Sequence, residues 1–210
     1  MHDYSIDRHP KQKVLFVLAF LAIAGAPYLN GLMKEIVTAV GVRAGWTSPP
    51  VTAVPVFVLF TVIYVLFDRY LWRWRWLRRF LLVPDLNGKW RCTGRTVKKD
   101  GEAKTFEWTG DVAITQSWSK ILVYLRTSQS ESKSISASLF HEHGVGYRLL
   151  YQYDNNPKAS ELDLGKHSGL TEVLFAESTD RGEGHYFTDQ HRGTVGELRL
   201  ERINHNGHPA

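Results

Sequence analysis

The sequence predicts a membrane α-hairpin of two transmembrane helices followed by an all-β soluble domain, and three observations lead to this fold class. Two long stretches near the N-terminus, residues 14–33 and 44–67, contain no charged side chain. From residue 85 onward, apolar residues recur at every second position, which is typical of β-strands. The composition changes at the same place, from apolar, aromatic and basic to polar with many Gly, Ser and Thr residues. We therefore place the domain boundary after residue 84.

The chain length and cysteine content limit the possible architectures. The chain has 210 residues and a formal net charge of +5, so it can form one domain or two small ones. Its single cysteine, Cys92, excludes an intramolecular disulfide and a cluster of thiolate metal ligands.

The two uncharged stretches are long enough to cross a bilayer. Twenty helical residues rise about 30 Å, the thickness of the hydrocarbon core, and we predict spans at about residues 14–33 and 47–67. Pro27, Asn30 and Gly31 predict a kink or an early end of the first helix. A pair of buried helices and a signal peptide are the alternatives. Buried helices of a soluble protein are usually shorter or amphipathic, but neither stretch has a polar face. A second span follows the first stretch, which argues against a signal peptide.

Basic residues predict the orientation of the spans. Lys11 and Lys13 precede the first span, five arginines follow the second between residues 69 and 79, and the connection carries only Lys34 and Arg43. The positive-inside rule therefore places both termini and the β-domain in the cytoplasm. The junction at residues 68–80, DRYLWRWRWLRRF, alternates Trp with Arg, a pattern that suits the lipid headgroup region better than a nucleic acid. We expect a lipid bilayer as partner, and no DNA or RNA.

Residues 85–203 predict about eight short antiparallel strands separated by turns, and residues 204–210 a disordered tail. A meander of this size favours a small closed barrel over a sandwich, because closure removes the exposed edges. Gly88, Lys89 and Trp90 resemble the Gly-x-Trp start of lipocalin-type barrels. That resemblance implies that Trp90 closes one barrel end beneath Arg199 or Arg202.

The sequence contains no motif for catalysis. It lacks a Walker loop, His-Glu-x-x-His, Gly-x-Ser-x-Gly and Cys-x-x-Cys. We therefore predict no enzyme activity, no catalytic residues, no cofactor and no metal site.

A binding pocket is the remaining possibility, since an eight-stranded barrel can hold one small ligand. Aromatic faces for stacking and arginine forks for phosphate suit a nucleotide. In this interpretation Arg126 and Arg192 contact phosphates, and the aromatic residues stack on bases. The candidate ligand-binding residues are Trp118, Tyr124, Arg126, Ser134, Tyr151, His167, Tyr186, Thr188 and Arg192.

Several short motifs in this architecture resemble one known family. They are residues 86–92 (LNGKWRC), 110–118 (GDVAITQSW), 132–134 (SKS), 150–155 (LYQYDN), 167–169 (HSG) and 184–188 (GHYFT). With two N-terminal spans and a basic-aromatic junction, the chain is similar to the SMODS-associated two-transmembrane β-strand-rich effectors of CBASS anti-phage defence.

The resemblance implies a receptor for a cyclic dinucleotide, located in the bacterial inner membrane. The ligand is made by a CD-NTase cyclase, with a functional link and no direct contact implied. Ligand binding in the barrel then causes the spans to form a homo-oligomer, which disrupts the membrane and kills the infected cell. Two alternatives remain: a membrane-anchored, lipocalin-like carrier or sensor of a lipid-like ligand, and a solid barrel that binds another protein.

Overall fold

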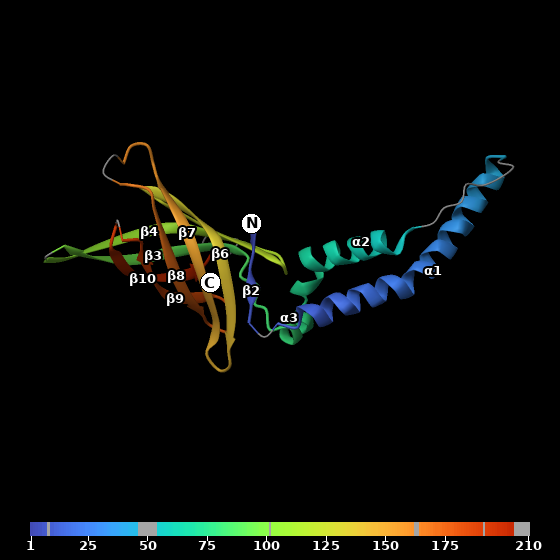
Figure 1. Ribbon diagram of the computed structural model, residues 1–210, viewed down its shortest axis with the longest axis horizontal. Coiled ribbons are helices and arrows are strands. Elements are labelled where there is room, and N and C mark those ends of the chain that lie inside the picture. The colour runs from blue at the N-terminus through green and yellow to red at the C-terminus, as the bar shows by residue number, and fades with distance from the viewer. Residues whose placement is uncertain (8, 46–53, 101, 162–163, 191, 204–210) are drawn as a thin grey trace. The chain divides into compact units, whose positions relative to one another are not determined.

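The computed structural model describes residues 1–7, 9–45, 54–100, 102–161, 164–190 and 192–203 (Figure 1). Its elements in chain order are β1 (His2–Asp3), β2 (Ser5–Ile6), α1 (Lys11–Arg43), α2 (Val56–Arg69), the 3₁₀ helix η1 (Leu71–Arg73), α3 (Arg75–Leu81), β3 (Gly88–Asp100), β4 (Glu102–Gln116), β5 (Lys120–Thr127), β6 (Ser130–Glu142), β7 (Gly146–Pro157), β8 (His167–Phe175), β9 (Arg181–Thr188) and β10 (Thr194–Arg202).

The chain divides into two compact units. His9–Trp74 form a helical unit, and Met1–Arg8 together with Arg75–Ala210 form a β-rich unit. The sequence predicts that residues 1–84 form one region with the spans. The structure instead groups the first residues with the barrel, because β1 and β2 pair with barrel strands. The expected tail at residues 204–210 lies outside the described residues.

Helix α1 is long and apolar enough to cross a bilayer, and in the described part of the chain it is the helix that meets this requirement. Its 33 residues rise about 50 Å, so it extends well beyond a hydrocarbon core. It continues through Pro27 to Arg43, so the early end considered above does not occur. The helix changes direction part-way along, as a proline in a helix interior produces (Figure 1).

Helix α2 has 14 residues, which rise about 21 Å. Residues 46–53, where the predicted second span begins, lie outside the described residues, so that span stays a prediction. Asn30 of α1 connects to the segment before α2: its Oδ1 accepts from the Val54 N–H at 2.7 Å, and its Nδ2 donates to the Val54 carbonyl at 3.4 Å. The Asn30 amide thus supplies a hydrogen-bond partner to both backbone groups of Val54.

The predicted all-β domain is a closed barrel. In the described residues, the strand order β5-β4-β3-β10-β9-β8-β7-β6 closes through pairing of β5 with β6, and these eight strands are antiparallel to their neighbours. Every second side chain therefore points inward, as the alternating pattern predicted. The core includes Val112 and Ile114 of β4 and Leu149 of β7, all buried.

One end of the barrel is closed by Trp90 and Arg202. Trp90 is fully buried, its indole N–H donates to the Leu86 carbonyl at 3.1 Å, and the Arg202 guanidinium lies 4.5 Å from the ring centre. Arg202 also donates to the carbonyls of residues 85, 87 and 179 at 2.7, 2.8 and 2.9 Å. Arg202 is thus the arginine that the Gly-x-Trp motif implied, whereas Arg199 pairs with Glu183 on the outer surface.

The closure between β5 and β6 is short. The two strands pair directly at Tyr124 with Lys133, Leu125 with Ser132 and Arg126 with Glu131. A bulge lies between Ser134 and Ser136 of β6. Next to it, β1 pairs with β5 and β2 pairs in parallel with β6, so the first residues of the chain fill the seam where β5 and β6 separate.

Replacing Arg202 with Ala tests the end closure. The variant leaves carbonyls of the closed end without their charged donor and uncovers Trp90, so we expect a loss of about 2–4 kcal/mol in the free energy of unfolding. Arg199→Ala on the same strand removes only an exposed ion pair and should cost less than about 1 kcal/mol. Chemical denaturation of the full chain in detergent measures both; equal losses would contradict this role of Arg202.

Candidate functional site

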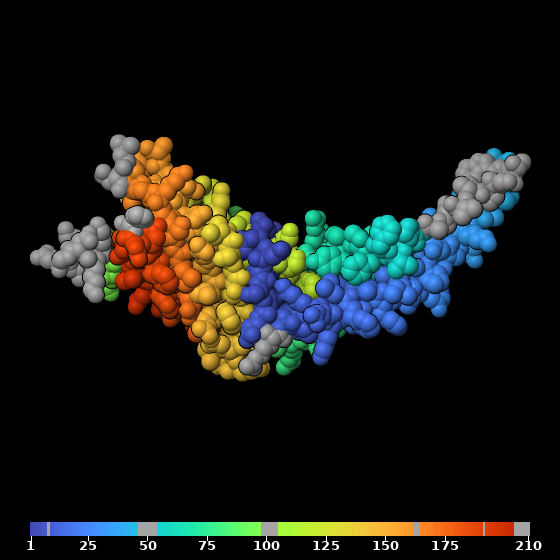
Figure 2. All heavy atoms as spheres, viewed as in Figure 1, coloured from blue at the N-terminus to red at the C-terminus, as the bar shows by residue number. Residues whose placement is uncertain are grey.

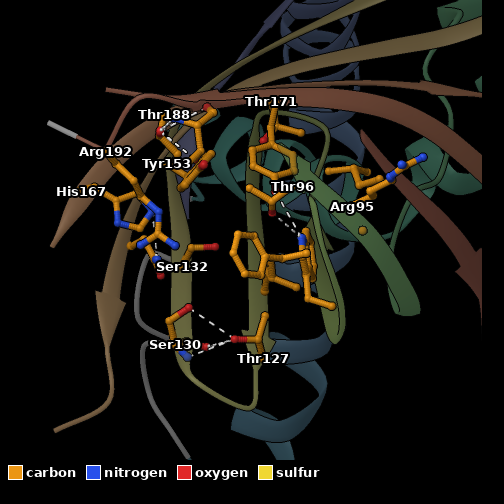
Figure 3. A pocket seen from close by; sticks show the side chains of 18 of the residues that line it. Arg95, Thr96, Thr127, Ser130, Ser132, Tyr153, His167, Thr171, Thr188 and Arg192 are labelled. Atoms are coloured by element: carbon orange, nitrogen blue, oxygen red, sulfur yellow. Dashed lines mark hydrogen bonds between the residues drawn. The ribbon is translucent and has the colours of Figure 1, made fainter. Parts of the chain in front are cut away.

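A large cavity opens at the barrel end opposite Trp90. Its volume, including the open mouth, is about 1940 Å³, which exceeds the ~300–1,000 Å³ common for small-molecule pockets. Residues of all eight barrel strands, β3 to β10, line it, together with loops that join the strands at this end. Figure 3 shows part of its lining, in which hydroxyl groups are frequent.

Two aromatic rings form one wall of the cavity. Trp108 and Tyr186 pack edge to face with ring centres 6.0 Å apart. The Trp108 indole N–H donates to Thr96 Oγ1 at 3.1 Å and to the Tyr186 hydroxyl at 3.2 Å, and Thr96 and Tyr186 also share a hydrogen bond. This network holds both rings in fixed orientations.

Glycines allow these rings to lie flat against the strands. A Cβ atom at Gly94 would come within 2.2 Å of the Trp108 ring, and one at Gly196 within 2.6 Å of the Tyr186 ring. Real Cβ atoms do not approach this closely, so any side chain at either glycine would displace its ring. The glycines on β3 and β10 thus determine how far the aromatic wall extends into the cavity.

Two further tyrosines, Tyr151 and Tyr153 of β7, line the cavity and are almost fully buried. Burial raises the pKa of both phenols well above the usual value. Both hydroxyls therefore keep their protons at physiological pH. They can donate hydrogen bonds to a ligand while their rings offer apolar faces.

His167, Arg192 and Thr188 lie together on another side of the cavity (Figure 3). The His167 Nδ1–H donates to the Gly165 carbonyl at 3.1 Å, so Nε2 is the acceptor for the Asn155 amide nitrogen at 3.2 Å. Burial, with Arg192 nearby, lowers the pKa of His167. The imidazole is therefore neutral near pH 7, and Arg192 supplies a cation to this wall.

Hydroxyl groups are frequent in the remaining lining. Thr127, Ser130 and Ser132 lie at the β5–β6 turn, and Thr171 lies on β8 (Figure 3). These groups can donate and accept hydrogen bonds without adding charge. The cavity therefore suits a ligand with both flat and strongly polar parts.

Five of the nine predicted ligand-binding residues line this cavity: Tyr151, His167, Tyr186, Thr188 and Arg192. The structure brings them together from β7, β8, β9 and the loop before β10. The four others do not line the cavity, and the position of each has a physical reason.

Tyr124 and Arg126 lie on the outer face of β5. Their strand points Ile121 and Val123 inward, and the opposite phase is therefore outward. Tyr124 donates to Glu131, and Arg126 donates to the Tyr124 hydroxyl at 3.2 Å, so the pair belongs to a surface network.

Trp118 and Ser134 lie inside the protein but away from the cavity lining. Trp118 is buried in the turn between β4 and β5, which is at the closed end. The Ser134 hydroxyl accepts from the Val123 N–H at 2.9 Å and is 2.7 Å from His2 Nε2, so it belongs to the β5–β6 seam.

Sequence reasoning missed Trp108 and Thr96 as cavity residues. A signal was present for Trp108, which shares the inward phase of Val112 and Ile114 on the same strand. The contribution of Thr96 depends on its hydrogen bonds to residues 12 and 90 positions away, which strand periodicity does not reveal. Among the described residues, no group of three or more His, Cys, Asp or Glu side chains is placed to hold a metal ion.

Comparison with known proteins identifies both parts of the chain. Residues 81–202 match the family "Cap15, cyclic dinucleotide receptor domain", and residues 12–73 match "Cap15, TM helices". CD-NTase-associated protein 15 of Yersinia aleksiciae is 40% identical over 143 residues, which cover 68% of this chain and 67% of that protein. The protein of the same name from Staphylococcus schleiferi is 28% identical over 173 residues, 82% of this chain and 88% of that protein.

These matches confirm the resemblance to CBASS membrane effectors that the sequence motifs indicated. The barrel with its open cavity is the receptor domain, and α1 lies within the transmembrane region. The chain belongs to the Cap15 family, in which a cyclic dinucleotide receptor domain is joined to transmembrane helices.

Proposed function

We propose that the cavity of the barrel is the cyclic dinucleotide site, and that its occupation causes the membrane helices to self-associate and disrupt the inner membrane. One observation carries the proposal: the cavity combines aromatic faces, protonated phenols, many hydroxyls and arginine side chains around one open-ended space. No single residue is diagnostic, but the combination matches the chemistry of a nucleotide.

Each part of a cyclic dinucleotide has a suitable partner here. The bases can stack on Trp108, Tyr186 or Tyr153, and stacking of a base on an aromatic side chain contributes about 1–3 kcal/mol. Arg192 can form charge-assisted hydrogen bonds to a phosphate. The serine and threonine hydroxyls can bond to ribose or phosphate oxygens. The cavity volume leaves room for two bases joined by a phosphodiester ring.

The alternatives fit this cavity less well. A carrier of a lipid-like ligand needs a wholly apolar lumen, whereas Thr96, Ser132 and Thr171 place hydroxyls on several strands. A solid barrel that binds only another protein would contain no cavity of about 1940 Å³.

The helical unit supplies the membrane part of the proposal. Gly25, Ala22 and Ala26 are small residues of α1 that permit close helix contact. A Cβ atom at Gly25 would lie 3.6 Å from Leu59 of α2, and Ala22 and Ala26 are buried. The small-residue face is thus used within the chain. The exposed apolar face that includes Phe16 and Phe20 is available to lipid or to a second copy.

The location and partners follow from the same reasoning. The basic residues that flank the spans favour both termini and the barrel in the cytoplasm. There the barrel meets a ligand released by a cyclase without contacting that enzyme. The protein acts as a receptor, with the cyclic dinucleotide as activating ligand in place of a cofactor.

Titration of the full chain in detergent with a panel of cyclic dinucleotides tests the binding step by calorimetry. We expect at least one member to bind, and the same member to cause dye release from liposomes that contain the protein. Failure of every member to bind would refute the proposal.

Arg192→Ala and Arg126→Ala form a matched pair inside and outside the barrel. Loss of a charge-assisted hydrogen bond costs about 1.5–3 kcal/mol, so Arg192→Ala should weaken affinity for the cyclic dinucleotide roughly 10- to 150-fold. Arg126→Ala should change it less than about two-fold, because the side chain is exposed on the outer face. Calorimetry of both variants checks this; a larger effect at Arg126 would place the ligand outside the cavity.

Tyr186→Leu and Tyr124→Leu separate stacking in the cavity from surface effects. Tyr186→Leu removes a ring of the aromatic wall and should lower affinity about 5- to 150-fold. Tyr124→Leu should leave affinity within two-fold. Thermal unfolding of both variants verifies folding. Equal affinities of a folded Tyr186→Leu variant and the parent would exclude this ring from the site.

A further inference from the structure

The seam between β5 and β6 contains residues 2–6, which we call the N-terminal strap. His2 and Asp3 pair with Ile121 and Lys120 of β5, and Ser5 and Ile6 pair with Ser138 and Leu139 of β6. Figure 2 shows the strap, in dark blue, lying at the surface beside the yellow atoms of β6. The strap therefore replaces direct pairing where the two barrel strands separate.

The strap is held by side chains as well as by backbone pairing. Tyr4 is buried, its hydroxyl accepts from Gln116 Nε2 at 3.1 Å, and it donates to the Ser117 carbonyl at 3.4 Å. The hydroxyls of Ser5 and Ser138 are 2.7 Å apart. The Asp7 N–H donates to the Leu139 carbonyl at 2.9 Å, which extends the attachment by one residue.

His2 connects the strap to the inner face of β6. The His2 Nδ1–H donates to the Asp3 carbonyl at 3.0 Å, so Nε2 accepts from the Ser134 hydroxyl at 2.7 Å. Ser134 is two residues from Ser132, which lines the cavity and pairs with Leu125. A ligand contact that shifts this part of β6 therefore changes the site where the strap is bound.

The strap also limits how far the N-terminal end of α1 can move from the barrel. Only residues 7–10 separate Ile6 in the barrel wall from Lys11, the first residue of α1. Four extended residues span at most about 14 Å. Release of residues 2–6 would detach this link from the barrel wall, so that it no longer ties the start of α1 to the β5–β6 seam. A docked strap thus restricts any rearrangement of α1 that a ligand could drive.

We propose that the N-terminal strap is a latch, docked in the β5–β6 seam, whose release on ligand binding frees α1 for the rearrangement that permeabilises the membrane. This inference rests on the proposed function of the cavity. Because a ligand shifts an equilibrium only through differential affinity, it must bind the released state more tightly. Locking the strap must then lower affinity for the ligand.

The double variant Ser5→Cys with Ser138→Cys tests the latch in the full chain. The two hydroxyls are close enough for a disulfide to replace their contact with little change in backbone position. Cys92 does not interfere, because it is buried and burial raises its pKa to about 12. Ser5→Cys and Ser138→Cys as single variants control for the effect of each thiol.

Dye release from liposomes is measured with each protein at a cyclic dinucleotide concentration that calorimetry shows to be saturating. We expect the oxidised double variant to bind at least three-fold more weakly than its reduced form, and to release dye at least ten-fold more slowly. Reductant should restore both values, and the single variants should match the parent. Dye release by the oxidised double variant at the parental rate would overturn the latch.

Tyr4→Ala and Tyr4→Phe provide an independent test that needs no disulfide. Tyr4→Ala removes the buried ring and weakens docking, so half-maximal dye release should need at least three-fold less ligand. Tyr4→Phe retains the ring and should shift this concentration less. An unchanged or increased ligand requirement for Tyr4→Ala would overturn the latch. If the parent protein binds no cyclic dinucleotide, the proposed function itself fails, which calorimetry of the parent distinguishes from failure of the latch.

Discussion

Closure of the β-sheet is the constraint on which the other features of the receptor depend. Closure pairs the backbone groups at the strand edges and points alternate side chains inward. The interior must therefore either be packed with side chains or hold a ligand. At one end Trp90, Phe175 and Arg202 fill it. Toward the other end, aromatic rings, glycines and hydroxyl residues line an open space. A single closed sheet thus produces a packed base and an open cavity above it.

How well the sequence predicts a feature depends on how far apart along the chain the interacting residues lie. Period-two patterns predicted the barrel strands, because strand alternation depends on local spacing. The resemblance of Gly88, Lys89 and Trp90 to the lipocalin start implied an arginine over Trp90 but left Arg199 and Arg202 open, and the structure shows Arg202 in this place. The expectation that Arg126 faces the cavity is wrong, because the alternation along a strand does not by itself show which face is enclosed. The bulge after Ser134 and the pairing of the N-terminus with β5 and β6 involve distant segments, which local patterns do not reveal.

The cavity and the membrane helix are connected through few residues. Ser132 contacts the cavity, Ser134 bonds to His2, and a short link joins the strap to α1. In the latch that we propose, this short path lets a ligand in the cavity act on α1. Ser132 of the cavity lining and the short β5–β6 pairing lie on the same strand, β6. In that proposal, β6 links ligand binding to release of the strap.

The central claim is that the cyclic dinucleotide occupies the interior of the barrel. Photo-crosslinking of the full chain with a cyclic dinucleotide that carries an azide on its base tests this claim most directly. Peptide mass spectrometry should locate the adducts on cavity residues such as Trp108, Tyr153 and Tyr186. Adducts confined to the outer face around Tyr124 and Arg126, and competed by unlabelled ligand, would contradict it.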